Sequence, residues 1–113
     1  MTKTTDIILK VALDDEQVPE RIFWKAEGQQ EEWIQAKAFL LSIFEEDSKD
    51  TLKLDLWTKE FQMNEMDRLM FHTLQSLCET YRKATNNQEL AQAFRGFVNH
   101  FGEKTEIIPP TSG

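Results

Sequence analysis

Hydrophobic positions in the first half of the chain recur with a period of two, as in strands that bury one face. Residues 7–13 read Ile-Ile-Leu-Lys-Val-Ala-Leu, and Leu52, Leu54 and Leu56 alternate with Lys53, Asp55 and Trp57. Residues 36–44 lie between these segments and are apolar on both faces. Because the polar residues 45–50 form a turn-rich stretch, residues 36–44 and 52–57 are predicted to form a hairpin.

The stretch between residues 16 and 35 has no clear period. Pro19 has no N–H to donate and restricts Val18 to extended geometry. The apolar residues 22–24 that follow are compatible with a short edge strand or with a loop that packs inward. Gly28 and its neighbours interrupt the chain again, and residues 32–38 are also compatible with a helix.

Beyond Trp57 the hydrophobic period changes to 3.6, which is typical of helices. Asn64 is the predicted N-cap of a first helix, and Asn86-Asn87 is predicted to end it and to cap a second helix that stops at Gly102. The apolar stripe of the first helix comprises Met66, Leu69, Met70, Thr73, Leu74, Leu77, Cys78, Tyr81 and Ala84. The stripe of the second helix comprises Leu90, Phe94, Phe97, Val98 and Phe101.

These elements predict an α+β fold, in which an antiparallel sheet of three to four strands is followed by a two-helix hairpin packed on one face. A length of 113 residues predicts one domain, residues 1–113. Residues 1–5 and 109–113 are predicted to be loose. The short apolar pair Ile107-Ile108 could extend the edge of a sheet.

The charge and the single cysteine narrow the class of protein. The chain carries 13 Lys and Arg against 20 Asp and Glu, a net charge of −7, which disfavours binding to nucleic acid or to anionic membranes. Its acidic clusters are compatible with solvated turns or with a patch for a basic partner or a cation. Cys78 is the only cysteine, and the chain has no signal-peptide pattern or membrane-length apolar run. We therefore expect a soluble cytoplasmic protein.

No motif for catalysis or for a cofactor is present, so the sequence predicts a protein that is not an enzyme and binds no cofactor. Cys78 lies on the apolar stripe and is expected to be a small buried hydrophobe. His72 and Glu79 are seven positions apart and could share a helix face. The alternative function is therefore a module that binds a small ligand or a divalent metal, although neither His72 nor His100 has the spacing of a zinc motif.

The aromatic residues favour a contact surface. If Leu52, Leu54 and Leu56 face the helices, pleating turns Trp57 to the opposite face. Leu40 and Phe44, and also Ile8 and Ala12, would join Trp57 there. Such a face either is exposed and forms an interface, or is covered by residues 16–35, which carry several large apolar side chains.

Four segments resemble the GldC family of gliding motility proteins of Bacteroidetes. They are residues 51–66 (TLKLDLWTKEFQMNEM), residues 18–26 (VPERIFWKA), residues 82–85 (RKAT) and residues 101–103 (FGE). The run Leu-Asp-Leu-Trp-Thr-Lys at residues 54–59 is the most specific piece. Phe44-Glu45 stands where the family pattern has a Trp-Asp pair, and this leaves the strand prediction unchanged.

The resemblance implies a small non-catalytic accessory protein of gliding motility, a movement linked to the type IX secretion system. It implies no catalytic residues or cofactor, and its partners would be proteins of that machinery or a second copy of the chain, without membrane insertion. The matched residues expected to make contact are Trp24, Asp55, Trp57, Lys59 and Glu65, which join Leu40 and Phe44 in the predicted interface. Alternatively, Lys59 and Glu65 only organise the turn between strand and helix.

Overall fold

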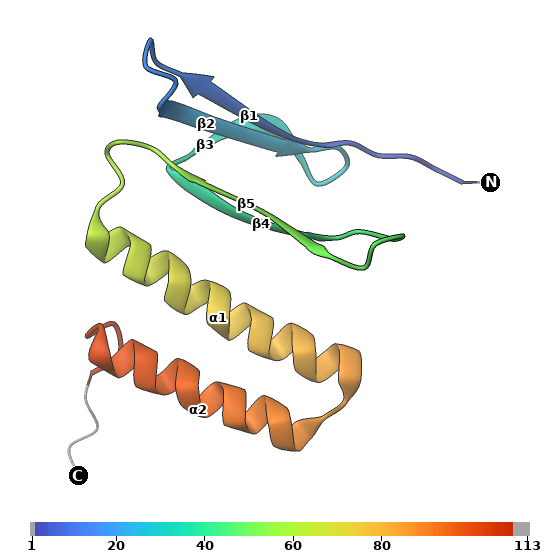
Figure 1. Ribbon diagram of the computed structural model, residues 1–113, viewed down its shortest axis with the longest axis vertical. Coiled ribbons are helices and arrows are strands. Elements are labelled where there is room, and N and C mark those ends of the chain that lie inside the picture. Colours follow the sequence, from blue (N-terminus) through green and yellow to red (C-terminus); the bar gives the residue numbers. More distant parts are fainter. Residues whose placement is uncertain (1, 110–113) are drawn as a thin grey trace. The chain divides into compact units, whose positions relative to one another are not determined.

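The computed structural model describes residues 2–109, in which five strands are followed by two helices (Figure 1). The strands are β1 (Ile7–Leu13), β2 (Pro19–Ala26), β3 (Gln30–Ala36), β4 (Ala38–Phe44) and β5 (Thr51–Trp57), and the helices are α1 (Met63–Thr85) and α2 (Gln88–Lys104). They form two compact units, one ending at Phe61 and one beginning at Gln62, and each is described by itself. The predicted α+β class is confirmed.

The first sheet has the order β1-β2-β3 and is antiparallel. β1 has the bounds predicted from its alternation. The segment 22–24, expected in an edge strand or a loop, instead belongs to the central strand, where Ile22 is fully buried between Val11 on β1 and Ala36 on β3. Pro19 is compatible with this position because it is the first residue of β2, where a missing N–H is tolerated.

Side-chain hydrogen bonds stabilise the two turns of this sheet. In the first turn, one carboxylate oxygen of Asp14 accepts the N–H groups of Glu16 (2.8 Å) and Val18 (3.0 Å). In the second turn, Gly28 has a φ of 84°, a conformation that favours glycine, and its N–H donates to Glu31. Residues 30–36 then form β3, so the helical alternative for residues 32–38 was wrong.

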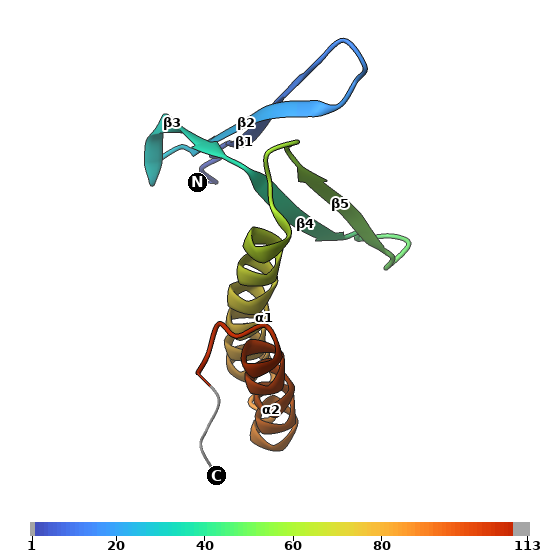
Figure 2. The same ribbon diagram turned by 90° about the vertical axis from the view of Figure 1, so that its left-hand side faces the viewer.

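The second sheet is the predicted hairpin of β4 and β5, in which Leu41 lies opposite Leu54. Residues 45–50 close it through a hydrogen bond from the Glu45 N–H to the Asp50 carbonyl. Only Lys37 separates β3 from β4, so the chain passes directly from one sheet into the other (Figure 2). The expected single sheet of three to four strands is therefore two sheets, and Ile8 and Ala12 lie in a different sheet from Trp57.

Both ends of α1 are capped, but the first cap differs from the prediction. Gln62 is the N-cap in place of Asn64, and its N–H donates to the Glu65 carboxylate at 3.0 Å. At the other end, Asn86 adopts a left-handed conformation (φ 56°), and the Asn87 side chain accepts the N–H of Leu90 at 3.0 Å. The predicted role of Asn86-Asn87 in ending one helix and starting the next is confirmed.

The buried apolar residues of the helical hairpin are Phe71 and Cys78 of α1 and Ala91 and Val98 of α2. The Cys78 thiol donates to the Ala91 carbonyl at 3.3 Å, which confirms that this cysteine is buried. The helical hairpin therefore holds together by its own contacts, and its packing on a sheet face stays a prediction. Neither helix of residues 2–109 is apolar and long enough to cross a bilayer.

Gly102 was expected just beyond the second helix but lies inside α2, which continues to Lys104. Its carbonyl accepts the N–H groups of Ile107 (2.9 Å) and Ile108 (3.0 Å), so these two residues fold back onto the helix end and belong to no strand. Residues 2–6 and 109 are also outside the helices and strands, as expected. The remainder of the predicted loose ends, residues 1 and 110–113, lies outside the described residues.

Candidate protein interface

The register of β4 and β5 places four of the predicted interface residues on one face of the second sheet. Leu40 lies opposite Asp55, Trp57 lies opposite Ala38, and Phe44 lies opposite Thr51. Because residues two apart along a strand share a face, Leu40, Phe44, Asp55 and Trp57 all point to the same side. We call this surface the Trp57 face; it also carries Ser42 and Lys53.

The large side chains of the Trp57 face are accessible. Phe44 is 68% exposed and Trp57 is 51% exposed, whereas Leu40 is half-buried. Residues 16–35, which the sequence left as a possible cover, form β2, β3 and their turns in the first sheet. The two aromatic side chains are therefore exposed apolar groups of the kind that mark interfaces.

A polar strip separates the two aromatic ends of this face. The Lys53 ammonium lies 3.0 Å from the Asp55 carboxylate and 3.0 Å from the Ser42 hydroxyl. Trp57 and Phe44 stand at opposite ends of the hairpin, six strand positions or roughly 20 Å apart. The Trp57 face thus has an aromatic anchor at each end of a charged centre.

The structure does not bring the other three predicted residues to this face. Trp24 lies on β2, paired with Leu9 and Ile34 in the first sheet. Lys59 forms an ion pair with Asp14, and Glu65 caps α1 through the Gln62 N–H. The contact of Glu65 therefore agrees with the alternative that it organises the turn between strand and helix. Lys59 does not fit that alternative, because its partner Asp14 lies in the turn between β1 and β2.

The ion pair between Lys59 and Asp14 connects the segment after β5 to the turn between β1 and β2. The hydrogen bond from Lys59 lowers the pKa of Asp14, and the N–H groups of Val18 and Glu16 lower it further. The same hydrogen bond raises the pKa of Lys59. Next to Lys59, Thr58 is buried and its N–H donates to the Lys37 carbonyl at 2.8 Å, at the junction of the two sheets. Lys59 and Thr58 thus connect the segment after β5 with the β1–β2 turn and with the residue that joins the two sheets.

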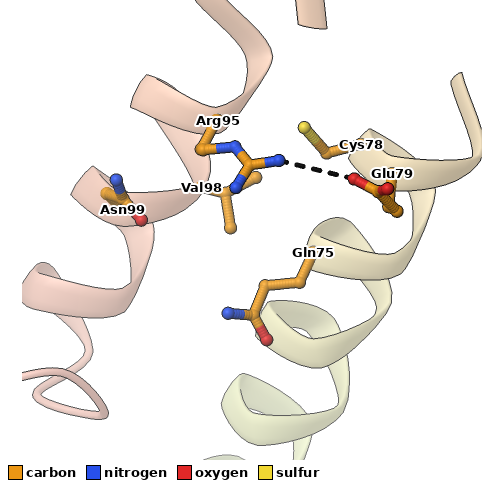
Figure 3. A pocket seen from close by; sticks show the side chains of 6 residues that line it. All are labelled: Gln75, Cys78, Glu79, Arg95, Val98 and Asn99. Carbon is orange, nitrogen blue, oxygen red and sulfur yellow. Dashed lines mark hydrogen bonds and ion pairs between the residues drawn. The ribbon is translucent and has the colours of Figure 1, made fainter. Parts of the chain in front are cut away.

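The helical hairpin has a small polar cavity, which Figure 3 shows, lined by Gln75, Cys78 and Glu79 of α1 and by Arg95, Val98 and Asn99 of α2. Arg95 reaches across it to Glu79 at 3.5 Å, and Arg82 also pairs with Glu79. The hydrogen bond from Arg82 is the main cause of the lowered pKa of Glu79.

The alternative of a metal site at His72 and Glu79 finds no support in this arrangement. Two arginines occupy the Glu79 carboxylate, and the His72 ring nitrogen Nδ1 lies 3.3 Å from the Gln75 side-chain oxygen. Within residues 2–109, no group of three His, Cys, Asp or Glu side chains is arranged to hold a metal ion. The polar cavity of the helical hairpin is therefore a place where an ion pair connects α1 and α2.

The cluster of Lys10, Lys25 and Trp33 was not predicted from the sequence. The ammonium groups of Lys10 and Lys25 lie 4.4 and 4.8 Å from the centre of the Trp33 ring. These residues belong to β1, β2 and β3, so their meeting depends on the pairing of three strands, and the pairing of β3 was not predicted. Lys10 lies in the alternating segment 7–13, but Lys25 and Trp33 lie in the stretch without a clear period, so the sequence holds no signal for this cluster.

The fold and the Trp57 face define a small α+β protein with an exposed, amphipathic sheet surface. The family model for gliding motility-associated GldC-like proteins matches residues 19–107, from the first residue of β2 to just beyond α2. The chain belongs to this GldC-like family, so the resemblance seen in its sequence is confirmed. No curated protein and no solved structure matches the chain.

Proposed function

We propose that this chain is a non-catalytic accessory protein of bacterial gliding motility that acts by protein contact through the Trp57 face. Membership of the GldC-like family supports the link to motility. The exposure of Trp57 and Phe44 supports the contact mechanism. In this proposal the protein works in the cytoplasm of a Bacteroidetes cell, and its partner belongs to the gliding and type IX secretion machinery.

The composition of the Trp57 face suits a reversible contact. Tryptophan is enriched among the residues that dominate binding energy, because a large ring buries much apolar area with few rotatable bonds. The ion pair of Lys53 and Asp55 keeps the centre of the face hydrated in the free protein and can fix the register of a partner. The opposite face of the hairpin differs in being wholly apolar; its residues are Phe39, Leu41, Ile43, Leu52, Leu54 and Leu56.

The test replaces the aromatic anchor in the organism that encodes the protein. We expect Trp57→Ala to reduce colony spreading and to weaken capture of motility proteins about thirtyfold, because truncation of a tryptophan that anchors an interface typically removes about 2 kcal/mol of binding energy. The purified variant should keep the helical circular dichroism and thermal midpoint of the wild type, since Trp57 is half exposed.

Met63→Ala is the matched control, because Met63 is also a large exposed apolar residue but lies at the start of α1. It should leave both spreading and capture unchanged. Wild-type spreading and capture by Trp57→Ala at normal protein levels would refute the proposal. Equal losses from Met63→Ala would also refute it, because the effect would then not belong to the Trp57 face.

A further inference from the structure

A second surface with different chemistry lies on the first sheet, around Trp33. Trp33 is 39% exposed, and the ammonium groups of Lys10 and Lys25 both lie over its ring, at 4.4 and 4.8 Å from the ring centre. A small hollow beside the ring is lined by Lys10, Phe23 and Trp33. The three strands of the sheet therefore each contribute to one mixed aromatic and basic cluster.

The strand register extends this cluster along β2. Phe23 lies opposite Lys10 on β1 and opposite Gln35 on β3, so the three side chains share a face. Arg21 and Lys25 lie two residues to either side of Phe23 and point the same way. We call this surface the basic face; its residues are Lys10, Arg21, Phe23, Lys25, Trp33 and Gln35.

Among the described residues, the cations of the basic face have no carboxylate partners, although the chain is acidic overall. Within residues 2–109, no Asp or Glu lies in ion-pair distance of Lys10, Arg21 or Lys25. The chain as a whole has a net charge of −7. Attraction to the electron-rich face of Trp33 holds Lys10 and Lys25 in place and lowers the entropy that they would lose on binding an anion.

We propose that the basic face binds an acidic segment of a protein partner. Carboxylates of the segment would pair with Lys10, Lys25 and Arg21, and one apolar side chain would fill the hollow between Phe23 and the exposed part of Trp33. This site is on a different sheet from the Trp57 face and does not depend on the function proposed above.

The distribution of charge favours a short acidic peptide over a nucleic acid. The basic face is bordered by carboxylates, because Glu20 and Glu60 line the adjoining cleft with Arg21 and Lys59. The acidic residues 14–16 follow β1 directly. A long polyanion that crossed the face would meet these charges and the net negative field of the chain, whereas a short segment need only cover the face.

The experiment observes the three tryptophan indole N–H resonances of the ¹⁵N-labelled full chain by NMR. The probe is a ten-residue glutamate peptide with one central phenylalanine, and Trp33→Phe identifies the Trp33 signal. We expect the peptide to shift the Trp33 signal and leave the Trp57 signal in place. The double variant Lys10→Ala, Lys25→Ala should weaken binding about tenfold, and added salt should weaken it as well.

Lys53→Ala is the matched control, because Lys53 is an exposed lysine on the second sheet; it should bind the peptide as the wild type does. Absence of a Trp33 shift, or unchanged binding by the double variant, would overturn the proposal. A ten-nucleotide thymidine strand that binds more tightly than the peptide would overturn it in favour of a nucleic acid. Because Trp57→Ala should bind the peptide normally, failure here is distinct from failure of the proposed function.

Discussion

Substitution of Gly102 by alanine tests a close packing contact near the end of α2. A Cβ atom at this position would lie 2.5 Å from a ring carbon of Phe71 and 2.6 and 2.9 Å from two side-chain carbons of Ile108. Separations below 3.0 Å are far inside van der Waals contact, and Phe71 is only 3% exposed, so its ring has little room to move. Gly102→Ala therefore forces the end of α2 and the Ile107–Ile108 segment to shift.

The expected magnitude follows from two opposing effects. Overpacking of a core by one methyl group destabilises by about 1–3 kcal/mol. Replacement of glycine by alanine inside a helix stabilises by about 1 kcal/mol, because alanine loses less backbone entropy on folding. Gly96→Ala provides the second effect alone, since Gly96 is in the same helix and its Cβ would meet nothing within 4 Å. The two alanine variants should therefore differ by the overpacking energy of about 1–3 kcal/mol.

The assay is thermal and urea unfolding of both variants and the wild type, followed by circular dichroism of the helices. Gly96→Ala should unfold above the wild type, and Gly102→Ala should unfold at least about 4 °C below Gly96→Ala. Ile108→Ala removes two of the three close contacts, so its cost combined with Gly102→Ala should be smaller than the sum of the single costs. Equal midpoints for the two alanine variants would refute the packing argument.

Two further predictions concern the ion pair and the helix cap. Because the folded pKa of Asp14 is lowered and that of Lys59 is raised, their pairing stabilises the fold between the unfolded pKa values, about 3.8 and 10.5. The difference in Tm between the wild type and Asp14→Asn should be constant in that range. It should vanish as the pH falls through the lowered pKa of Asp14 or rises through the raised pKa of Lys59. A difference in Tm that is independent of pH would contradict this. Glu65→Ala should lose about 0.5–2 kcal/mol in urea unfolding, whereas Glu65→Gln keeps an acceptor for the Gln62 N–H and should lose less; equal losses would exclude the cap.

Much of the second sheet could be predicted from the sequence, because its geometry is local. Alternation in residues 52–57 requires Trp57 and Asp55 to share a face, and the short turn at residues 45–50 leaves β4 only one close partner. The caps at Asn86 and Asn87 are equally local, since each makes its bonds within a few residues. The Trp57 face and the β4–β5 hairpin are thus determined by the spacing of residues within one short segment.

Other features could not be predicted, because they depend on residues far apart in the chain. Ile22 could not be recognised as a central-strand residue, since Pro19, three residues before it, is typical of an edge. The role of Lys59 depends on Asp14, which is 45 positions away in the chain. A glycine near the end of a predicted helix can cap the helix or, like Gly102, leave space for a buried ring, and the sequence alone does not distinguish the two.

The sequence by itself determined the α+β class, the family, and which side chains of each strand share a face, because periodicity and local turns are properties of neighbouring residues. Only the tertiary structure decided that β2 is central, that the strands divide into two sheets, and that Lys10 and Lys25 meet at Trp33. The physical reason is that strand pairing joins segments by backbone hydrogen bonds, which are nearly independent of residue type. The packing of the whole sheet therefore decides which strands pair, and no single segment of the sequence determines it.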